Sequence, residues 1–366
     1  MTEQPPRLFY PALTGLRFVA ASMVFVLHYK SGIFPAAPVW LANLLGEFHT
    51  GVAIFFVLSG FLITHQYLHY NFTSVSKYSA YLLIRLGRIL PLYIPVFLEV
   101  HSRWLFAVPD LFLHLTLLKG FFKKVHLTGV IQSWTLTVEL TFYVLAPLLF
   151  WLARKGTLLL PYIFALLTGI ILTGIGFGLS TLGHNPFGFM PDFAFTALST
   201  FFGRATEFFV GMGLAYYINS QHNISRISAP VTGFFTYSGL GLFWLLLFLI
   251  STGANGNQAG INTWYGLLLH NLFLPLGIGL LLFGLMYEKT WLSQILSSRL
   301  FILLGNASYA FYLLHLGRAG NIAGELTRNM LPLQFLLLWG FSISIYLVWE
   351  KPIYKLIKVK VQAALS

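Results

Sequence analysis

Ten apolar runs follow one another along this 366-residue chain, with no long polar stretch between them. A helix needs about 20 apolar residues to cross the hydrocarbon core of a bilayer. Hydrophobic residues make up 57% of the chain and charged residues only 9%, a composition that excludes an ordinary soluble domain. We therefore expect an all-α, polytopic transmembrane bundle of about ten spans, at 12–32, 48–68, 82–103, 133–152, 158–180, 203–219, 231–252, 263–286, 300–318 and 333–352.

The positive residues between these runs predict the orientation of the bundle, because cytoplasmic loops carry an excess of Lys and Arg. With the N-terminus inside, the inner loops and the tail hold thirteen of them and the outer loops hold seven. We therefore expect both termini in the cytoplasm. The inner set is Arg7, Lys77, Arg85, Arg88, Arg154, Lys155, Arg226, Lys289, Arg299, Lys351, Lys355, Lys358 and Lys360; the outer set is Lys30, Arg103, Lys119, Lys123, Lys124, Arg318 and Arg328.

We expect one integral membrane domain over residues 1–366, with 1–11 as a cytoplasmic N-terminal segment and 353–366 as a basic cytoplasmic tail. The polar start, Met1 to Tyr10, carries one basic residue, so no cleavable signal is expected. The net charge of +12 is expected to reflect positive loops and anionic lipid rather than nucleic acid. The chain has no Cys, which excludes disulfides, a thiol nucleophile and thiolate metal sites. We expect no metal.

The first apolar run carries two polar residues, Arg17 and His28. A charged residue at the centre of a membrane helix costs about 2.5–3.5 kcal/mol on insertion scales. Eleven helical steps place the two side chains on one face, about 16 Å apart along the axis. One interpretation is a functional face; the other is that Arg17 reaches back to the interface and His28 only ends the helix.

Two further motifs have both a functional and a structural interpretation. Ser59-Gly60 lies in Gly51-Val-Ala-Ile-Phe-Phe-Val-Leu-Ser-Gly-Phe-Leu, where small residues favour close helix packing. Arg85 and Arg88 lie three residues apart on one helical face. Two guanidinium groups there can bind phosphates, and they also fit the excess of positive charge expected inside.

The fourth and later runs carry more ionisable side chains. Glu139 lies about two turns into its run, at a depth that matches His28, so the carboxylate and the imidazole could orient one another. Arg204 and Glu207 lie three residues apart and could pair with each other. His315 lies in the outer half of the ninth run, where a hydrogen-bonded packing role is the alternative to a catalytic one.

The outer basic segment Lys119 to Lys124 precedes the fourth run. It could gather an anionic acceptor, or it could cap a short interfacial helix, Asp110 to Leu118. The pattern favours the second interpretation slightly. Two outer segments, Gly183–Asp192 and Ser251–Asn262, are rich in Gly, Pro and Asn and are predicted to be loops.

The ordered set of motifs resembles the acyltransferase-3 family of integral membrane acyltransferases over nearly the whole chain. The set is Leu-Thr-Gly-Leu-Arg17 with His28, the Ser59 motif, Arg85-x-x-Arg88 with Pro91, Ser-Trp134-x-Leu-x-Val-Glu139 with Phe142-Tyr143, Arg204-x-x-Glu207, Ser308-Tyr309 to His315, and Glu350-x-Pro352. The family's opening usually has Asp where this chain has Thr14, which removes a carboxylate beside Arg17. The resemblance is to a member without a fused esterase-like domain.

The resemblance implies transfer of an acyl group, most often acetyl, from cytoplasmic acyl-CoA to a hydroxyl of an extracytoplasmic saccharide, lipid-linked glycan or small molecule. It implies that His28 is the base or transient acyl carrier, that Arg17 stabilises the donor or oxyanion, and that Glu139 orients His28 or the acceptor. Arg85 and Arg88 would bind CoA phosphates. Acceptor-side or supporting residues would be Ser59, Trp134, Arg204, Glu207 and His315.

The family also implies a multi-pass protein of the bacterial inner membrane. The sequence leaves open the acceptor, the length of the acyl group, the oligomeric state, and whether His28 carries the acyl group. The main alternative is a proton-coupled transporter or flippase of a glycan or lipid-linked substrate. No internal repeat supports it. A non-catalytic membrane scaffold is the third possibility.

Overall fold

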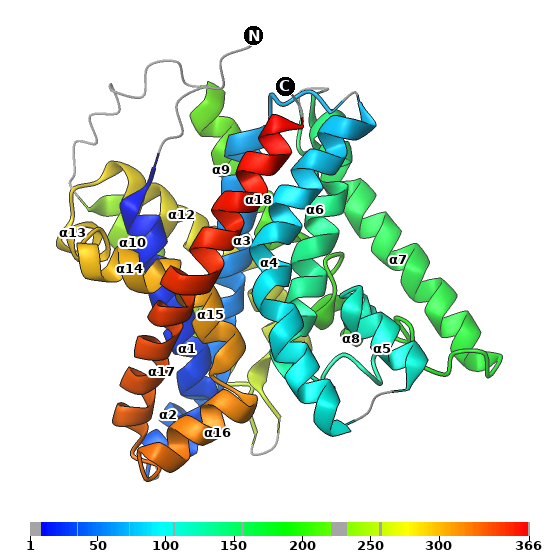
Figure 1. Cartoon of the computed structure of the whole chain (residues 1–366). Helices are drawn as coiled ribbons and strands as arrows, with labels where there is room; N and C mark the ends of the chain where they lie inside the picture. Colours follow the sequence, from blue (N-terminus) through cyan, green and yellow to red (C-terminus); the bar gives the residue numbers. More distant parts are fainter. Residues whose placement is uncertain are drawn as a thin grey trace. The chain divides into compact units, whose positions relative to one another are not determined.

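The computed structural model describes residues 9–34, 36–72, 74–104, 107–154, 157–220, 233–255 and 258–364. These residues form helices and no β-strand beyond two isolated bridges, Phe122–Phe189 and Asn255–Gln258 (Figure 1). The all-α fold is therefore confirmed. Most of the expected N-terminal segment, including Arg7, lies outside the described residues, as do Lys155 and Arg226.

The chain divides into two compact units. Unit 1 comprises Met1–Tyr70 and Glu207–Ser308, and unit 2 comprises Asn71–Thr206 and Tyr309–Ser366. The helices of unit 1 are α1 (Pro11–Ile33), α2 (Val39–Gly46), η1 (Glu47–Thr50), α3 (Gly51–Tyr67), α9 (Ala205–Ser220, from Glu207), α10 (Phe234–Ser251), η5 (Gly260–Asn262), α11 (Trp264–Leu268), η6 (Leu269–Phe273), α12 (Leu274–Tyr287), α13 (Trp291–Leu296) and α14 (Arg299–Asn306).

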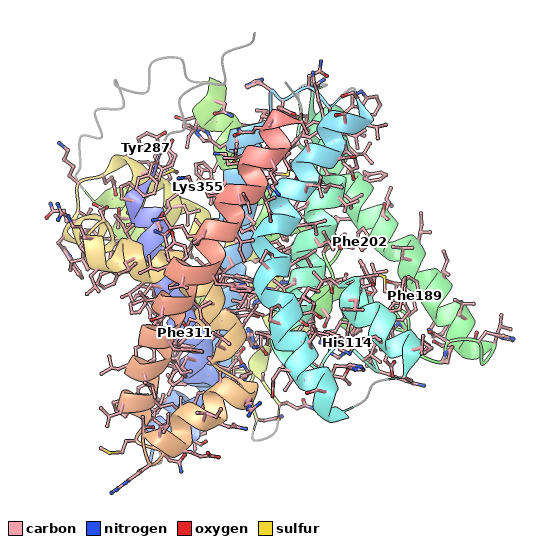
Figure 2. The ribbon with its side chains drawn as sticks, viewed as in Figure 1. His114, Phe189, Phe202, Tyr287, Phe311 and Lys355 are labelled. Atoms are coloured by element: carbon pink, nitrogen blue, oxygen red, sulfur yellow. The ribbon has the colours of Figure 1, made fainter. Side chains whose placement is uncertain are left out.

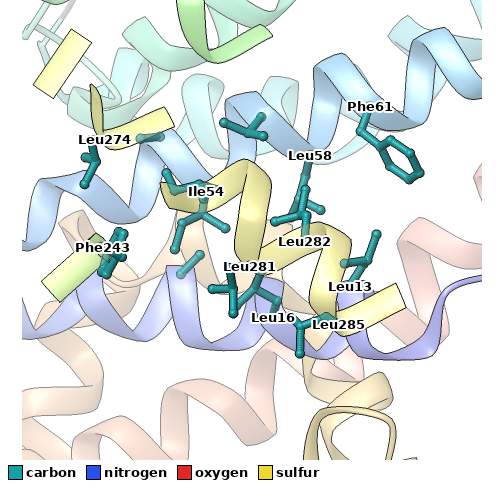
Figure 3. Close-up of a cluster of buried hydrophobic side chains, with 14 of the residues drawn as sticks. Leu13, Leu16, Ile54, Leu58, Phe61, Phe243, Leu274, Leu281, Leu282 and Leu285 are labelled. Carbon is teal, nitrogen blue, oxygen red and sulfur yellow. The ribbon is translucent and has the colours of Figure 1, made fainter. Parts of the chain in front are cut away.

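The core of unit 1 is a cluster of aliphatic and aromatic side chains from α1, α3, α10 and α12 (Figure 3). Leu13 and Leu16 of α1 meet Leu58 of α3 and Leu282 of α12 in this cluster, and each is almost fully buried. In lipid, apolar burial between helices gains little free energy, so the fit between helix surfaces matters more.

Glycines set that fit at two helix contacts in unit 1. A Cβ on Gly305 of α14 would lie 1.8 Å from the Thr14 carbonyl oxygen of α1. A Cβ on Gly60 of α3 would lie 2.2 Å from the Phe208 carbonyl oxygen of α9. Only glycine lets the backbones approach this closely. The packing interpretation of Ser59-Gly60 is therefore confirmed for the glycine.

The helices of unit 2 are α4 (Val75–Trp104), α5 (Val108–Leu115), η2 (Lys119–Phe121), η3 (Ile131–Ser133), α6 (Trp134–Ala153), α7 (Leu159–Thr181), α8 (Phe193–Ser199), α15 (Ser308–Leu314, from Tyr309), α16 (Gly317–Leu326), α17 (Leu331–Ile345), η7 (Tyr346–Glu350) and α18 (Lys351–Ala363). The helix α4 packs against α6, η7 and α18. The expected interfacial helix is α5, which begins two residues before Asp110 and ends before Leu118.

Prolines shape the contact between α4 and the C-terminal helices. Pro95 has no N–H group, so it leaves the carbonyl of Pro91, four residues earlier, without its helical partner. The indole Nε1 of Trp349 donates a 2.8 Å hydrogen bond to this carbonyl. The π-helical turn η7 then precedes Pro352, and the helix continues through α18 to Ala363. The expected basic tail is thus helical and packs on α4.

Eight described segments are long and apolar enough to cross a membrane: Pro11–Ile33, Val39–Tyr67, Val75–Ser102, Ile131–Ala153, Leu159–Thr181, Phe234–Ser251, Trp264–Tyr287 and Leu331–Ala363. The sixth expected run, 203–219, and the ninth, 300–318, are not among these eight segments. The sixth run contains α9, which has 16 residues. The ninth run is split into α14 and α15 at Ala307. This residue lies within Gly305-Asn-Ala-Ser308, where Gly, Asn and Ser disfavour a continuous helix.

Candidate active site

In unit 1, α1 carries the predicted Arg17 and His28. Arg17 is half-buried, and its guanidinium carbon lies 5.9 Å from the ring centre of Phe55 on α3, within the range of a cation–π contact. His28 lies near the far end of α1 with an exposed side chain. An exposed imidazole can meet a substrate, whereas the guanidinium is held on the helix bundle. Ser59 is half-buried on α3, next to the close contact at Gly60.

In unit 2, the predicted arginine pair lies near the predicted acid. Arg85 is buried, with its guanidinium carbon 5.9 Å from the ring centre of Tyr81, and Arg88 is exposed. The Tyr143 hydroxyl donates a short hydrogen bond to Oε1 of Glu139. The charges of Arg85, Arg88 and Glu139 all act electrostatically on this hydroxyl. The structure thus brings α4 and α6 together around one phenol.

Tyr309 on α15 adds a second phenol to this group. Its hydroxyl donates a 2.7 Å hydrogen bond to the carbonyl oxygen of Ile89 on α4. The charges of Glu139 and Glu350 both act on it. Tyr143 and Tyr309 were not among the predicted site residues, although both stand in the quoted motifs. The spacing of Tyr143, four residues after Glu139 on a helix, is the signal that could have identified it.

We use the name polar centre of unit 2 for Arg85, Arg88, Glu139, Tyr143, Tyr309 and Glu350. Two guanidinium groups and two carboxylates lie here among apolar helices, where ionisable residues are costly and mark function. The arginines can bind phosphate or pyrophosphate oxygens. Glu139 can accept a proton or orient a hydroxyl group through Tyr143.

His315 lies just after α15, at the end of a second hydrogen-bonded chain in unit 2. It is fully buried, and its Nδ1 lies 2.8 Å from the carbonyl oxygen of Tyr312. Because a carbonyl only accepts, Nδ1 carries the proton in this contact. The Tyr312 hydroxyl lies 3.1 Å from Oγ1 of Thr135, and Gln132 donates from Nε2 to the Leu313 carbonyl oxygen at 2.7 Å. Trp134, half-buried, begins α6 beside this chain.

A cavity of about 540 Å³ borders this hydrogen-bonded chain within unit 2. It is lined mainly by apolar side chains of α4, α16 and α17, and by Gln132 and Leu313. Arg318 and Glu99 also line it, and they form an ion pair at 3.4 Å between partly exposed side chains. The volume falls in the range of small-molecule sites, roughly 300–1,000 Å³.

The outer basic segment is only partly an open cationic surface, because Lys123 and Lys124 are exposed and Lys119 is not. Lys119 is fully buried, and its Nζ donates hydrogen bonds to the carbonyl oxygens of Thr128, at 2.6 Å, and Val130, at 2.9 Å. Lys123 forms a 2.6 Å ion pair with Asp192. Thr137 of α6 accepts from the Gly120 N–H, which joins the segment to α6. These contacts give Lys119 and Lys123 roles in the fold, but none of them caps α5, so both interpretations of the segment stay predictions.

Burial also perturbs the titration of this segment. Desolvation lowers the pKa of Lys119 to about 7. Desolvation, with the charges of Lys119 and His101, lowers the pKa of His114 to about 4. Figure 2 labels His114, whose ring stacks on Phe97 with ring centres 4.9 Å apart. Burial alone would raise the pKa of Asp192, but hydrogen bonds from Lys123 and from the Phe195 N–H lower it.

Arg204 and Glu207 are both almost fully buried. Arg204 precedes α9, and its Nη1 donates to the Leu198 carbonyl oxygen at 3.3 Å, while Glu207 lies in the first turn of α9. The two residues fall in different units, as do His28 and Glu139. The expected pairing of Arg204 with Glu207 and that of His28 with Glu139 therefore stay predictions. Among the described residues, no group of three or more His, Asp or Glu side chains could hold a metal ion.

The chain matches the model of the acyltransferase domain family, acyltransferase-3, over residues 10–349. Relatives from Staphylococcus aureus strains COL and MSSA476, provisionally named O-acetyltransferases, are each 22% identical to it in alignments 389 positions long. The alignments cover 98% of this chain and 58% of each relative, so the chain spans less than two thirds of their length. No solved structure matches the chain significantly.

Proposed function

We propose a specific reaction for this chain, which belongs to the acyltransferase-3 family. We propose that it is a membrane enzyme that acetylates a hydroxyl group of an extracytoplasmic saccharide, with cytoplasmic acetyl-CoA as the donor. The observation that carries the proposal is the polar centre of unit 2. It joins two arginines, suited to an anionic donor, to a carboxylate–phenol pair, suited to proton transfer.

CoA is anionic and cannot cross the bilayer, so its donor site needs cations at the cytoplasmic face. Arg85 and Arg88 lie in the half of α4 that follows Lys77, and the distribution of positive residues predicts that this half faces the cytoplasm. The buried Arg85 would bind a phosphate without competing water, and the exposed Arg88 would meet the incoming donor first.

The acceptor hydroxyl must lose a proton as it attacks the thioester carbonyl. His28 is the proposed base, because a neutral imidazole nitrogen can accept a proton from a hydroxyl group and this side chain is exposed. Arg17, on the same face, would stabilise the developing oxyanion. Glu139, held by Tyr143, would orient His28 or the acceptor. The C–O bond of the ester forms, the C–S bond of the thioester breaks, and CoA leaves as a thiol after taking a proton.

The remaining predicted residues would support the acceptor side. The apolar cavity beside Gln132 would enclose the less polar part of the acceptor, next to His315 and Trp134. Ser59, Arg204 and Glu207 would hold the helices that surround the transfer path. The proposed location is a bacterial inner membrane, in keeping with bacterial relatives.

Release of CoA by the purified chain in liposomes tests this function, with acetyl-CoA as donor and a cell-envelope glycan extract as acceptor. We expect CoA release to require the extract, to be lost in His28→Ala, and to need more acetyl-CoA in Arg85→Ala. His69→Ala and Lys360→Ala, which change exposed residues, are the matched controls and should behave as wild type. Movement of a glycan or lipid-linked substrate without consumption of acetyl-CoA would instead establish a transporter.

A further inference from the structure

A buried carboxylate lies beside two imidazoles in unit 1, and none of these three residues belongs to the motifs quoted above. The residues are Glu47 and His49 on η1 and His270 on the π-helical turn η6. The helix η1 packs against α1 and α10. Lys30 of α1 donates to the Ala42 carbonyl oxygen of α2 at 3.4 Å, which fixes this end of unit 1 where α1 ends, near His28.

Glu47 is fully buried and is held on both oxygens. Its Oε1 accepts a 2.5 Å hydrogen bond from the Gly260 N–H, and its Oε2 lies 3.0 Å from Nε2 of His49. A buried carboxylate is stable only with such partners. The approach is an ion-pair contact rather than an aligned hydrogen bond, so the negative charge of Glu47 stabilises a proton taken up by the His49 imidazole.

His270 continues the same arrangement. It is fully buried, its ring centre lies 5.4 Å from that of His49 with the rings nearly perpendicular, and its Nδ1 lies 2.8 Å from Oδ1 of Asn271. A neutral imidazole that donates from Nδ1 keeps its basic nitrogen at Nε2. The turn that carries it is a π-helix, a rare geometry that occurs often at functional sites.

Few other charges reach this group. Of the elements packed against η1, α1 contributes Lys30 and His28, and η6 contributes His270. The helices α2 and α10 and the segments η5 and α11 carry no carboxylate, histidine, lysine or arginine, and α3 has its one histidine, His65, in its last turn. Glu47 is therefore the one carboxylate on these elements, and His49 is its cationic partner when protonated.

From this geometry we infer that Glu47, His49 and His270 form a proton relay, which carries the acceptor's proton out of the membrane during acyl transfer. The inference rests on the proposed function. The hydroxyl O–H bond breaks as the ester C–O bond forms, and the proton passes to the relay and then to water on the acceptor side. The thioester C–S bond breaks, and the CoA thiolate takes its proton from water on the donor side, so atoms and charge balance.

The isosteric variant Glu47→Gln tests the relay most sharply. Its amide oxygen can still accept from Gly260, but the neutral amide removes the negative charge that stabilises a proton on His49. We expect kcat to fall about 100-fold, as for loss of a general base, with unchanged affinity for acetyl-CoA. In His49→Ala, added imidazole should restore part of kcat. The control, His69→Ala, should keep the wild-type rate.

A second measurement follows the proton itself. Liposomes would hold the glycan extract and the dye pyranine inside, with acetyl-CoA added outside and valinomycin with K⁺ to dissipate charge. We expect the lumen to acidify in step with CoA release, and both signals to be lost in Glu47→Gln.

The outcomes separate the two proposals. CoA release without luminal acidification, or Glu47→Gln and His49→Ala variants with wild-type kcat, would overturn the relay and leave the proposed function standing. Should Glu47→Gln fail to fold, imidazole rescue of His49→Ala decides, and a lost rate that imidazole does not restore counts against the relay. Wild-type protein that neither binds nor consumes acetyl-CoA would overturn the proposed function, and the relay with it.

Discussion

Substitution of the buried Lys119 by Met should remove most of the pH dependence of stability between pH 7 and 10. The ordinary pKa of a lysine is 10.5, and burial lowers that of Lys119 to about 7 in the folded chain. Between these values the unfolded chain binds more protons than the folded one, so the free energy of unfolding rises with pH. The stabilisation is complete above pH 10.5 and is lost as pH falls towards 7.

The size of the effect follows from the gap between the two pKa values. At about 1.36 kcal/mol per unit, the full gap is worth roughly 5 kcal/mol. From pH 7, where the folded Lys119 is half-protonated, to pH 9, the gain is about 2 kcal/mol. Met has a similar length and carries no charge. The loss of the donor to the carbonyls of Thr128 and Val130 lowers stability equally at every pH, so the slope of stability against pH changes only through the missing titration of Lys119.

Thermal unfolding in detergent, measured from pH 7 to 10 for wild type and Lys119→Met, checks this. Lys123→Met is the matched control, because Lys123 lies four residues further on with a half-exposed side chain paired to Asp192. The control should keep the wild-type slope. A Lys119→Met variant whose midpoint rises with pH as steeply as that of wild type would refute the argument that Lys119 is a desolvated structural cation.

Three further predictions concern packing, capping and donor binding. Gly60→Ala should destabilise the chain by about 1–3 kcal/mol, since its Cβ would lie 2.2 Å from the Phe208 carbonyl oxygen; thermal unfolding should leave Gly174→Ala, which meets nothing within 4 Å, near wild type. Glu288→Gln should cost about 1.5–3 kcal/mol, because the carboxylate accepts from two N–H groups at the start of α10; denaturation with a chaotrope measures this. Arg85→Lys should raise the KM for acetyl-CoA roughly tenfold with little change in kcat, since a lysine keeps the charge but loses the two-pronged contact; a stable protein with unchanged KM would contradict the donor-site assignment.

The helical fold could be predicted from the sequence because bilayer-length apolar runs leave the backbone no other way to satisfy its hydrogen bonds. The exact positions of the helix breaks could not be predicted. Gly, Asn and Ser in the ninth run disfavour a continuous helix, but the close contact of Gly305 with the Thr14 carbonyl, just before the break at Ala307, belongs to tertiary packing. The continuation of the last helix past Pro352 likewise depends on the π-helical turn before it.

The candidate site could likewise be predicted only in part. The motifs identified Arg85, Arg88 and Glu139, and the helical spacing of four residues from Glu139 could have identified Tyr143 as its partner. Glu47, His49 and His270 could not be grouped from the sequence, because His270 follows the others by more than two hundred residues. The sequence left open whether the basic run from Lys119 to Lys124 gathers an acceptor or caps a helix, and it could not predict that Lys119 is buried against two carbonyls.

The most direct test of the proposed transfer across the membrane is to locate the acetyl group itself. Acetyl-CoA with a radiolabelled acetyl group would be supplied outside sealed proteoliposomes that hold the glycan extract inside, and the glycan would be recovered and treated with mild base. We predict label on the luminal glycan, released by base as acetate, and none with His28→Ala. Unlabelled glycan beside wild-type protein that binds acetyl-CoA, or equal labelling with His28→Ala, would contradict the account.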